Sequence, residues 1–167
     1  NLDYKYLIDK LYNVMFLFSV FILAITLVFG ISGANMETSN RSWLTVISIG
    51  SFEISIQPSE FVKLTFICTF AKHISTVRES INKPKTLLLL GIHVAVIVGL
   101  ILMSGDLGVS LVYLGIILMM LFCSGLSIWY FVAMIALALV AFPFLWDKLA
   151  FYQQQRILFG FNPEGDP

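Results

Sequence analysis

A series of apolar runs, each long enough to cross a lipid bilayer as a helix, constrains this chain more than any other feature. We expect five such spans, at residues 11–31, 58–74, 86–103, 107–123 and 128–146. Charged residues make up only 12% of the sequence, whereas a typical soluble domain carries about 25%. The sequence therefore predicts an all-α, polytopic membrane protein with a single membrane domain over residues 1–167. The formal net charge is zero, so no nucleic-acid partner is indicated.

Polar segments between the apolar runs predict the loops, at residues 32–57, 75–85 and 147–167. In the first loop, Phe52, Ile54 and Ile56 alternate with polar residues, which is the period of a half-buried strand. We therefore expect a small hairpin, formed by residues 43–50 and 52–57 and turning at Gly50-Ser51. In the last loop, residues 151–158 form an amphipathic run that we expect near the membrane interface.

The distribution of cations predicts the orientation, because cytoplasmic loops carry an excess of Lys and Arg. One side of the predicted topology has Lys5, Lys10, Lys72, Arg78, Lys83 and Lys85, and the other has Arg41, Lys148 and Arg156. The N-terminus and loop 75–85 are therefore expected in the cytoplasm, and loops 32–57 and 147–167 with the C-terminus outside. Glu60, Asp106 and Asp166 would then all lie at the outer face.

Opposite charges mark the start of the second span. Pro58 suits the first position of a helix, and Glu60 lies where the positive end of the helix dipole favours an anion. Lys63 is three residues further on and can pair with Glu60. One interpretation is a helix cap followed by a lysine that snorkels to the surface. We favour a pair that faces a polar cavity, since a lysine stem leans toward the helix N-terminus, where Glu60 already lies.

Two other polar residues lie at or within the spans. Asp106 follows Gly105 and precedes an apolar run, and we favour a plain N-cap for it. His93 lies within a span, where a hydrogen-bonded contact between helices is expected rather than a ligand or a proton relay. His73 is expected toward the cytoplasmic side, so no metal-ligand spacing is visible.

Four stretches together resemble the SEDS family (shape, elongation, division and sporulation), the RodA/FtsW/SpoVE peptidoglycan polymerases. They are Arg41-Ser42-Trp43-Leu44, Ile56-Gln57-Pro58-Ser59-Glu60-Phe61-Val62-Lys63, Gly105-Asp106-Leu107-Gly108, and Gln155-Arg156-Ile157-Leu158 leading into Asn162-Pro163-Glu164-Gly165-Asp166-Pro167. The resemblance covers essentially the whole chain and implies an internal fragment of a fold of roughly ten helices. The final turn lacks the tryptophan often found in division-type members, which favours a RodA-like protein.

The resemblance also implies a function. Members of the family link lipid II disaccharides into glycan strands at the outer face of the bacterial plasma membrane, in elongation or division, together with a class B penicillin-binding protein. Asp166 then maps to the catalytic aspartate. Gln57, Glu60 and Lys63 line the substrate cavity, and Arg41 and Arg156 join Lys63 on the lipid diphosphate. A divalent cation, Mg²⁺ or Mn²⁺, is implied by the resemblance alone.

The sequence leaves two other functions open. A lipid II flippase could use the same polar cavity, but it would need charged groups accessible from both faces and often an internal repeat. The sequence shows no repeat between its halves, and its acidic groups fall on one side. A scaffold for the cell-wall machinery would leave Glu60 and Lys63 without a chemical task.

Overall fold

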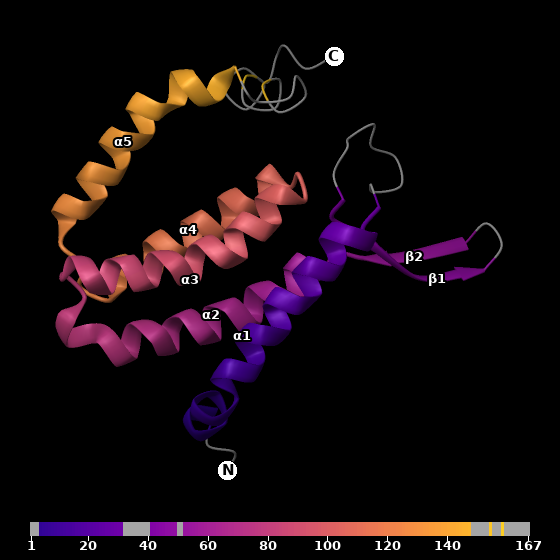
Figure 1. The fold of residues 1–167 in the computed structure, drawn as a ribbon, viewed down its shortest axis with the longest axis horizontal. Helices are drawn as coiled ribbons and strands as arrows, with labels where there is room; N and C mark the ends of the chain where they lie inside the picture. The colour runs from indigo at the N-terminus through magenta and orange to yellow at the C-terminus, as the bar shows by residue number, and fades with distance from the viewer. Residues whose placement is uncertain (1–3, 32–40, 50–51, 148–153, 155–157, 159–167) are drawn as a thin grey trace. The chain divides into compact units, whose positions relative to one another are not determined.

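The computed structural model describes residues 4–31, 41–49, 52–147, 154 and 158, and the chain divides into two compact units, Asn1–Leu126 and Ser127–Pro167. The first unit contains α1 (Tyr4–Phe29), α2 (Pro58–Val77), α3 (Pro84–Met103) and α4 (Leu107–Cys123), as Figure 1 shows. It also contains strands β1 (Leu44–Ile49) and β2 (Phe52–Ile56) and the short 3₁₀ helix η1 (Arg78–Ser80). The second unit contains α5 (Ile128–Trp146), which includes Pro143.

Each predicted span lies largely within one helix, but some helices begin or end outside the apolar run. α1 begins at Tyr4 and not at residue 11, because residues 4–10 contain no proline or glycine that would stop a helix. α3 begins at Pro84, in accord with the preference of proline for the first helical turn. Two segments of the described chain, Lys10–Phe29 and Pro84–Met103, are long and apolar enough to cross a membrane on their own. The shorter apolar helices are Leu107–Cys123 and Ile128–Phe144.

In the first unit, α2 packs against all three of the other α-helices. Its side chains Phe66 and Phe70 are buried and stack on each other, and the Phe66 ring lies against Tyr113 of α4. α1 also packs against α3, and α3 against α4. Short connections join α2 to α3 and α3 to α4, as is usual for neighbouring antiparallel helices. The polar segments at the two ends of α2 therefore lie at opposite ends of this helix group.

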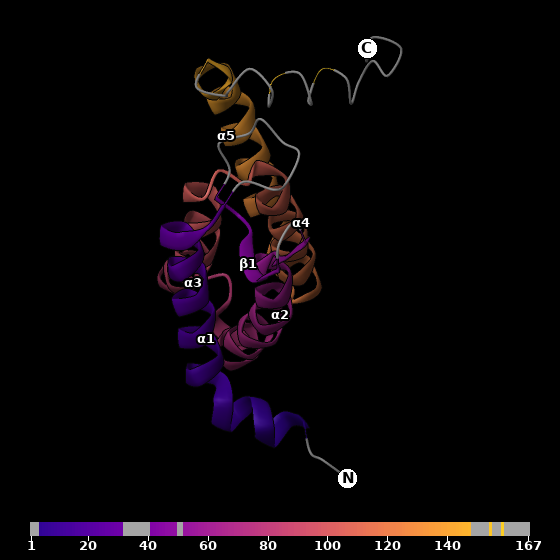
Figure 2. The same ribbon diagram turned by 90° about the vertical axis from the view of Figure 1, so that its right-hand side faces the viewer.

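The hairpin extends from the end of the helix group at which α2 begins (Figures 1 and 2). β1 and β2 are antiparallel, and a bulge between Thr45 and Ile47 leaves Val46 without a partner in the register. Without this bulge Val46 would pair with Ile54 and Ile47 with Glu53; with it, Ile47 pairs with Ile54 and Ser48 with Glu53. The bulge thus matches apolar residues with apolar ones across the hairpin.

The turn between α3 and α4 depends on glycine. Gly105 has a φ of +84°, a backbone conformation that residues with a side chain rarely adopt. The turn brings Asp106 to the N-cap of α4 directly after α3 ends. The direction in which α4 begins is therefore set by this glycine.

Candidate functional site

The first turn of α2 holds the predicted ion pair. Gln57 is extended at the N-cap, Pro58 follows at the helix start, and Glu60 lies in the first turn. The Lys63 ammonium donates hydrogen bonds to both carboxylate oxygens of Glu60, each at 2.9 Å. The Lys63 side chain is 20% exposed and that of Glu60 is 51% exposed. The lysine thus leans toward the helix start and pairs there, and the carboxylate that holds it is open to an incoming group.

Asp106 connects the start of α4 to the start of α2. Its Oδ1 accepts a hydrogen bond from the backbone N–H of Val109 at 3.1 Å, which is the N-cap contact of α4. Its Oδ2 accepts a second hydrogen bond, from Nε2 of Gln57, at 2.6 Å. The two residues are 49 positions apart, and no signal in the sequence links them.

Arg41 lies at the same end of the helix group. Its backbone N–H donates to the carbonyl of Ser104 at 2.9 Å, and its side chain is exposed. The turn that begins α4 and the segment that leads into the hairpin are therefore joined. Of the predicted site residues, the structure brings together Arg41, Gln57, Glu60, Lys63 and Asp106. Arg156 and Asp166 lie outside the described residues.

A divalent cation does not fit the donors at this end of the described chain. No group of three or more His, Cys, Asp and Glu side chains gathers among the described residues. Both oxygens of Glu60 accept from Lys63, and the two oxygens of Asp106 are engaged by Gln57 and Val109. The cation stays a prediction from the family resemblance.

His73 of α2 and His93 of α3 form a hydrogen-bonded contact that the sequence did not indicate. Nδ1 of His93 lies 3.2 Å from Nδ1 of His73, so one ring nitrogen donates a hydrogen bond and the other accepts it. The His93 ring packs against Phe16 of α1 and against Phe66 and Phe70 of α2. The expectation of an interhelical hydrogen bond for His93 is confirmed. The sequence did not indicate the contact with His73, which arises because antiparallel α2 and α3 bring residues 20 apart side by side. The expectation that His73 lies toward the cytoplasmic side stays a prediction.

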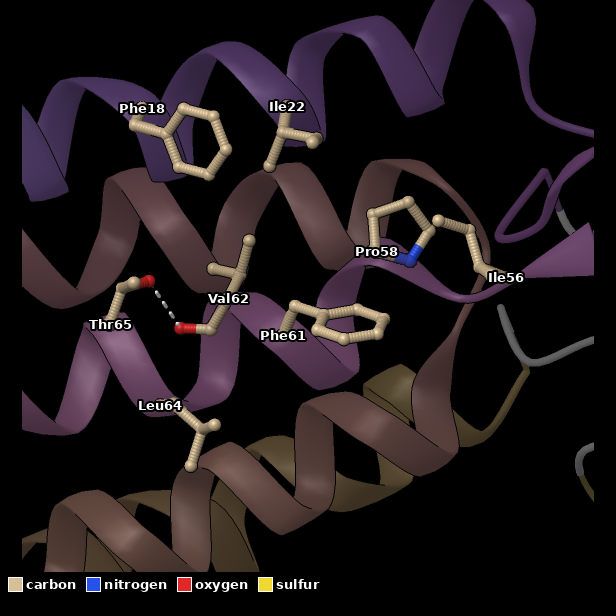
Figure 3. Close-up of a pocket in the computed structure, with 8 residues that line it drawn as sticks. All are labelled: Phe18, Ile22, Ile56, Pro58, Phe61, Val62, Leu64 and Thr65. Atoms are coloured by element: carbon tan, nitrogen blue, oxygen red, sulfur yellow. Dashed lines mark hydrogen bonds between the residues drawn. The ribbon is translucent and has the colours of Figure 1, made fainter. Parts of the chain in front are cut away.

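An apolar cavity of about 390 Å³ lies between α1, the end of β2 and α2 (Figure 3). It is lined by Phe18, Ile22, Ile56, Pro58, Phe61, Val62, Leu64 and Thr65. The Thr65 hydroxyl lies 2.9 Å from the Val62 carbonyl, to which it can donate, and 2.6 Å from the Ser19 hydroxyl. The lining therefore offers hydrocarbon and no unused polar group, and neither Glu60 nor Lys63 belongs to it.

The order of polar motifs along this helical membrane framework matches a known family model. The pattern of the FtsW/RodA/SpoVE family, described as a cell cycle protein, matches residues 1–167. The chain belongs to this family. It is 33% identical to stage V sporulation protein E of Bacillus subtilis over 88% of its own length. It is 32% identical to a probable peptidoglycan glycosyltransferase FtsW of Escherichia coli O157:H7 over 92% of its length.

Solved structures of family members show the same fold. A chain of a peptidoglycan synthase complex that coordinates polymerization and crosslinking matches 96% of this chain with a TM-score of 0.70 and 29% identity. The rod shape determining protein RodA of Thermus thermophilus matches 83% of it with a TM-score of 0.62 and 29% identity. This chain therefore has the helical membrane fold of the corresponding part of the FtsW/RodA/SpoVE family.

The chain spans only part of these relatives. It covers 38% of the B. subtilis protein, 35% of the E. coli protein, and 45% and 43% of the two structural neighbours. Sporulation, division and rod-shape proteins all match, so the preference for a RodA-like member stays a prediction.

Proposed function

We propose that the complete protein is a glycosyltransferase that polymerises lipid II into glycan strands at the outer face of the bacterial plasma membrane. The observation that supports this most is the Glu60–Lys63 pair, placed at one end of the helix group beside the Gln57–Asp106 contact. An ammonium held by a half-exposed carboxylate is a ready binding group for an anion such as a lipid diphosphate. The reaction class is supported by relatives that are named as probable peptidoglycan glycosyltransferases.

The reaction needs one proton acceptor and stabilisation of one leaving group. Asp166 would take the proton from the 4-hydroxyl of the acceptor N-acetylglucosamine. The hydroxyl oxygen then forms a bond to the anomeric carbon of the donor muramyl sugar, while the bond from that carbon to the diphosphate breaks. The electron pair leaves with the undecaprenyl diphosphate, and the configuration inverts from α to β.

Lys63, Arg41 and Arg156 would hold the departing diphosphate. The Lys63 ammonium has three N–H donors and gives two hydrogen bonds to Glu60. It can therefore rotate toward a more highly charged anion and stay protonated. Glu60 orients the ammonium in the absence of substrate. Gln57 lies at the edge of the same site.

The arrangement in the membrane is part of the proposal. The helices of this chain would supply five spans, with the N-terminus in the cytoplasm and the C-terminus outside. The Asn82 side chain donates to the Gly125 carbonyl at 3.5 Å, so the connection before α3 and the turn after α4 share one end of the helix group. Arg78, Lys83 and Lys85 lie near that end, as expected for a cytoplasmic face. A class B penicillin-binding protein would cross-link the product.

The test uses the complete protein, purified with and without Asp166→Asn and supplied with lipid II. We expect glycan polymer on a gel from the unchanged protein and a loss of about 10²-fold or more from the variant, which is the range that general acid–base catalysis typically contributes. Asp147→Asn, which changes another acidic residue after α5, is the matched control and should polymerise normally. Polymer at the normal rate from Asp166→Asn would remove Asp166 as the base. Transfer of lipid II across vesicles without any polymer would favour a flippase instead.

A further inference from the structure

Gln57 occupies the N-cap position of α2 without capping that helix with its side chain. Glutamine is not among the residues favoured at an N-cap, and here its amide is directed away from α2, to Oδ2 of Asp106 at 2.6 Å. The acceptor is a carboxylate, which makes this a charge-assisted hydrogen bond. The other oxygen of Asp106 already caps α4 through Val109. The contact with Gln57 is therefore not needed for the cap, and it joins two helices that lie far apart in the sequence.

A second hydrogen bond joins the same two helices, two residues further along α2 and seven residues further along α4. The Tyr113 hydroxyl of α4 donates to the backbone carbonyl of Ser59 at 2.8 Å, and Tyr113 is 0% exposed. The first turn of α2 is thus attached to α4 at two points, Gln57 and Ser59. Two attachments on one turn restrain both the height of this helix end and its rotation about the helix axis, in addition to the packing of α2 in the core.

The Glu60–Lys63 pair follows these attachments directly. Lys63 is six residues after Gln57, about 9 Å along the helix at 1.5 Å per residue. A rotation of the first turn of α2 about the helix axis would move the ammonium sideways, because Lys63 projects outward from that axis. The direction in which Lys63 can reach is therefore determined by where α4 holds Gln57 and Ser59.

We propose that Gln57 and Asp106 are positioning residues, whose hydrogen bond sets the place of the Lys63 ammonium relative to α4 and hence to the lipid diphosphate. This inference rests on the proposed glycosyltransferase function. Asp106 then does more than cap α4, and Gln57 acts through its hydrogen bond to Asp106 and not by direct contact with the substrate. Displacing an anion-binding group by about 1 Å can reduce a rate by about 10²-fold, so a contact of this kind is expected to affect turnover.

The test exchanges the two partners in the complete protein. Gln57→Glu places a second carboxylate against Asp106 and should push the start of α2 away. Asp106→Asn alone keeps the cap, and a flipped Gln57 amide can accept from the new amide, so its effect should be small. In the double variant, the introduced amide can cap Val109 and donate to the introduced carboxylate. We expect kcat for lipid II polymerisation to fall about tenfold to 10²-fold in Gln57→Glu and to recover most of this loss in the double variant.

Two further measurements separate positioning from simple stability. The thermal unfolding midpoint of each variant is measured in detergent, and kcat is normalised to folded protein, so that a structural loss does not count as a catalytic one. Gln57→Met, which removes the donor without adding charge, replaces Gln57→Glu if that variant does not fold. Thr45→Val, which removes the exposed Thr45–Ser55 hydrogen bond in the hairpin, is the matched control and should keep the normal kcat.

The outcomes are distinct. Normal kcat in both Gln57 variants, or a folded double variant as slow as Gln57→Glu, would overturn the positioning role. Recovery in the double variant supports it, because a general loss of stability would not be reversed by exchanging the partners. If the unchanged protein makes no polymer, the proposed function itself fails, and this result differs from any pattern among the variants.

Discussion

At the scale of single residues, Lys63 carries the charge on which the proposed chemistry depends, and Glu60 holds that charge in place. Lys63→Met keeps the length of the side chain but removes the cation, so we expect the polymerisation rate of the complete protein to fall by about 10²-fold or more. Glu60→Gln should cost less, because the ammonium stays and only its orientation is lost. The measurement is the initial rate of glycan synthesis from lipid II.

The control for this pair is Lys85→Met, which removes an exposed cation at the start of α3, at the opposite end of the helix group. It should leave the rate unchanged. If Lys85→Met lowers the rate as much as Lys63→Met does, the effect belongs to the overall charge of the protein and not to the site.

The histidine pair predicts a coupled effect on stability. His93→Leu leaves Nδ1 of His73 without its partner, and His73→Leu does the same to His93. Leaving a buried polar partner unsatisfied costs about 1–3 kcal/mol, and the His73–His93 contact is partly buried, so the lower end of that range applies. Each single variant should therefore lower the free energy of unfolding in detergent by that amount, and the double variant should lose less than the sum. Strictly additive losses would show that the two rings do not depend on each other.

At the scale of elements, the turn between α3 and α4 determines where Asp106 can point. Gly105 has a positive φ of +84°, and an L-residue with a side chain pays about 1–2 kcal/mol in the left-handed region. Gly105→Ala should lower the free energy of unfolding by about that amount. The measurement is a lower thermal unfolding midpoint in detergent.

Gly108→Ala is the matched control for this turn. Gly108 lies in the first turn of α4, and an added Cβ there would be 3.8 Å from Oδ1 of Asp106, an ordinary contact. Because alanine is a better helix former than glycine, this variant should be neutral or slightly stabilising. Equal destabilisation by both substitutions would mean that loss of glycine as such, and not the conformation of the turn, is responsible.

At the scale of the whole molecule, the proposed orientation makes opposite ends of the first unit accessible from opposite sides of the membrane. Thr45 lies in the hairpin, and Asn82 lies in the connection before α3. In a background with Cys68→Ser and Cys123→Ser, Thr45→Cys should react with an impermeant maleimide in intact cells, and Asn82→Cys only after permeabilisation. The reverse pattern would place the Lys63 end in the cytoplasm and exclude polymerisation at the outer face.

Local signals in the sequence determined where the elements lie. Apolar runs, the proline at the start of α2 and α3, and the glycine before Asp106 each act on their own neighbours, so helix positions followed from them to within a few residues at most ends. The alternation after residue 51 likewise indicated the hairpin, although the bulge at Val46 was not visible. The pairing of Glu60 with Lys63 was predictable for the same reason, because a spacing of three residues places both on one helix face.

Contacts between helices were decided only by the tertiary structure. Gln57 meets Asp106, and His73 meets His93, across separations of 49 and 20 residues. Whether such residues touch depends on the rotation and the relative height of two helices, and these follow from the packing of whole side-chain faces around Phe66, Phe70 and Tyr113. The sequence by itself thus specified the charged pair and the helix that carries it, whereas packing between helices decided what holds that pair in place.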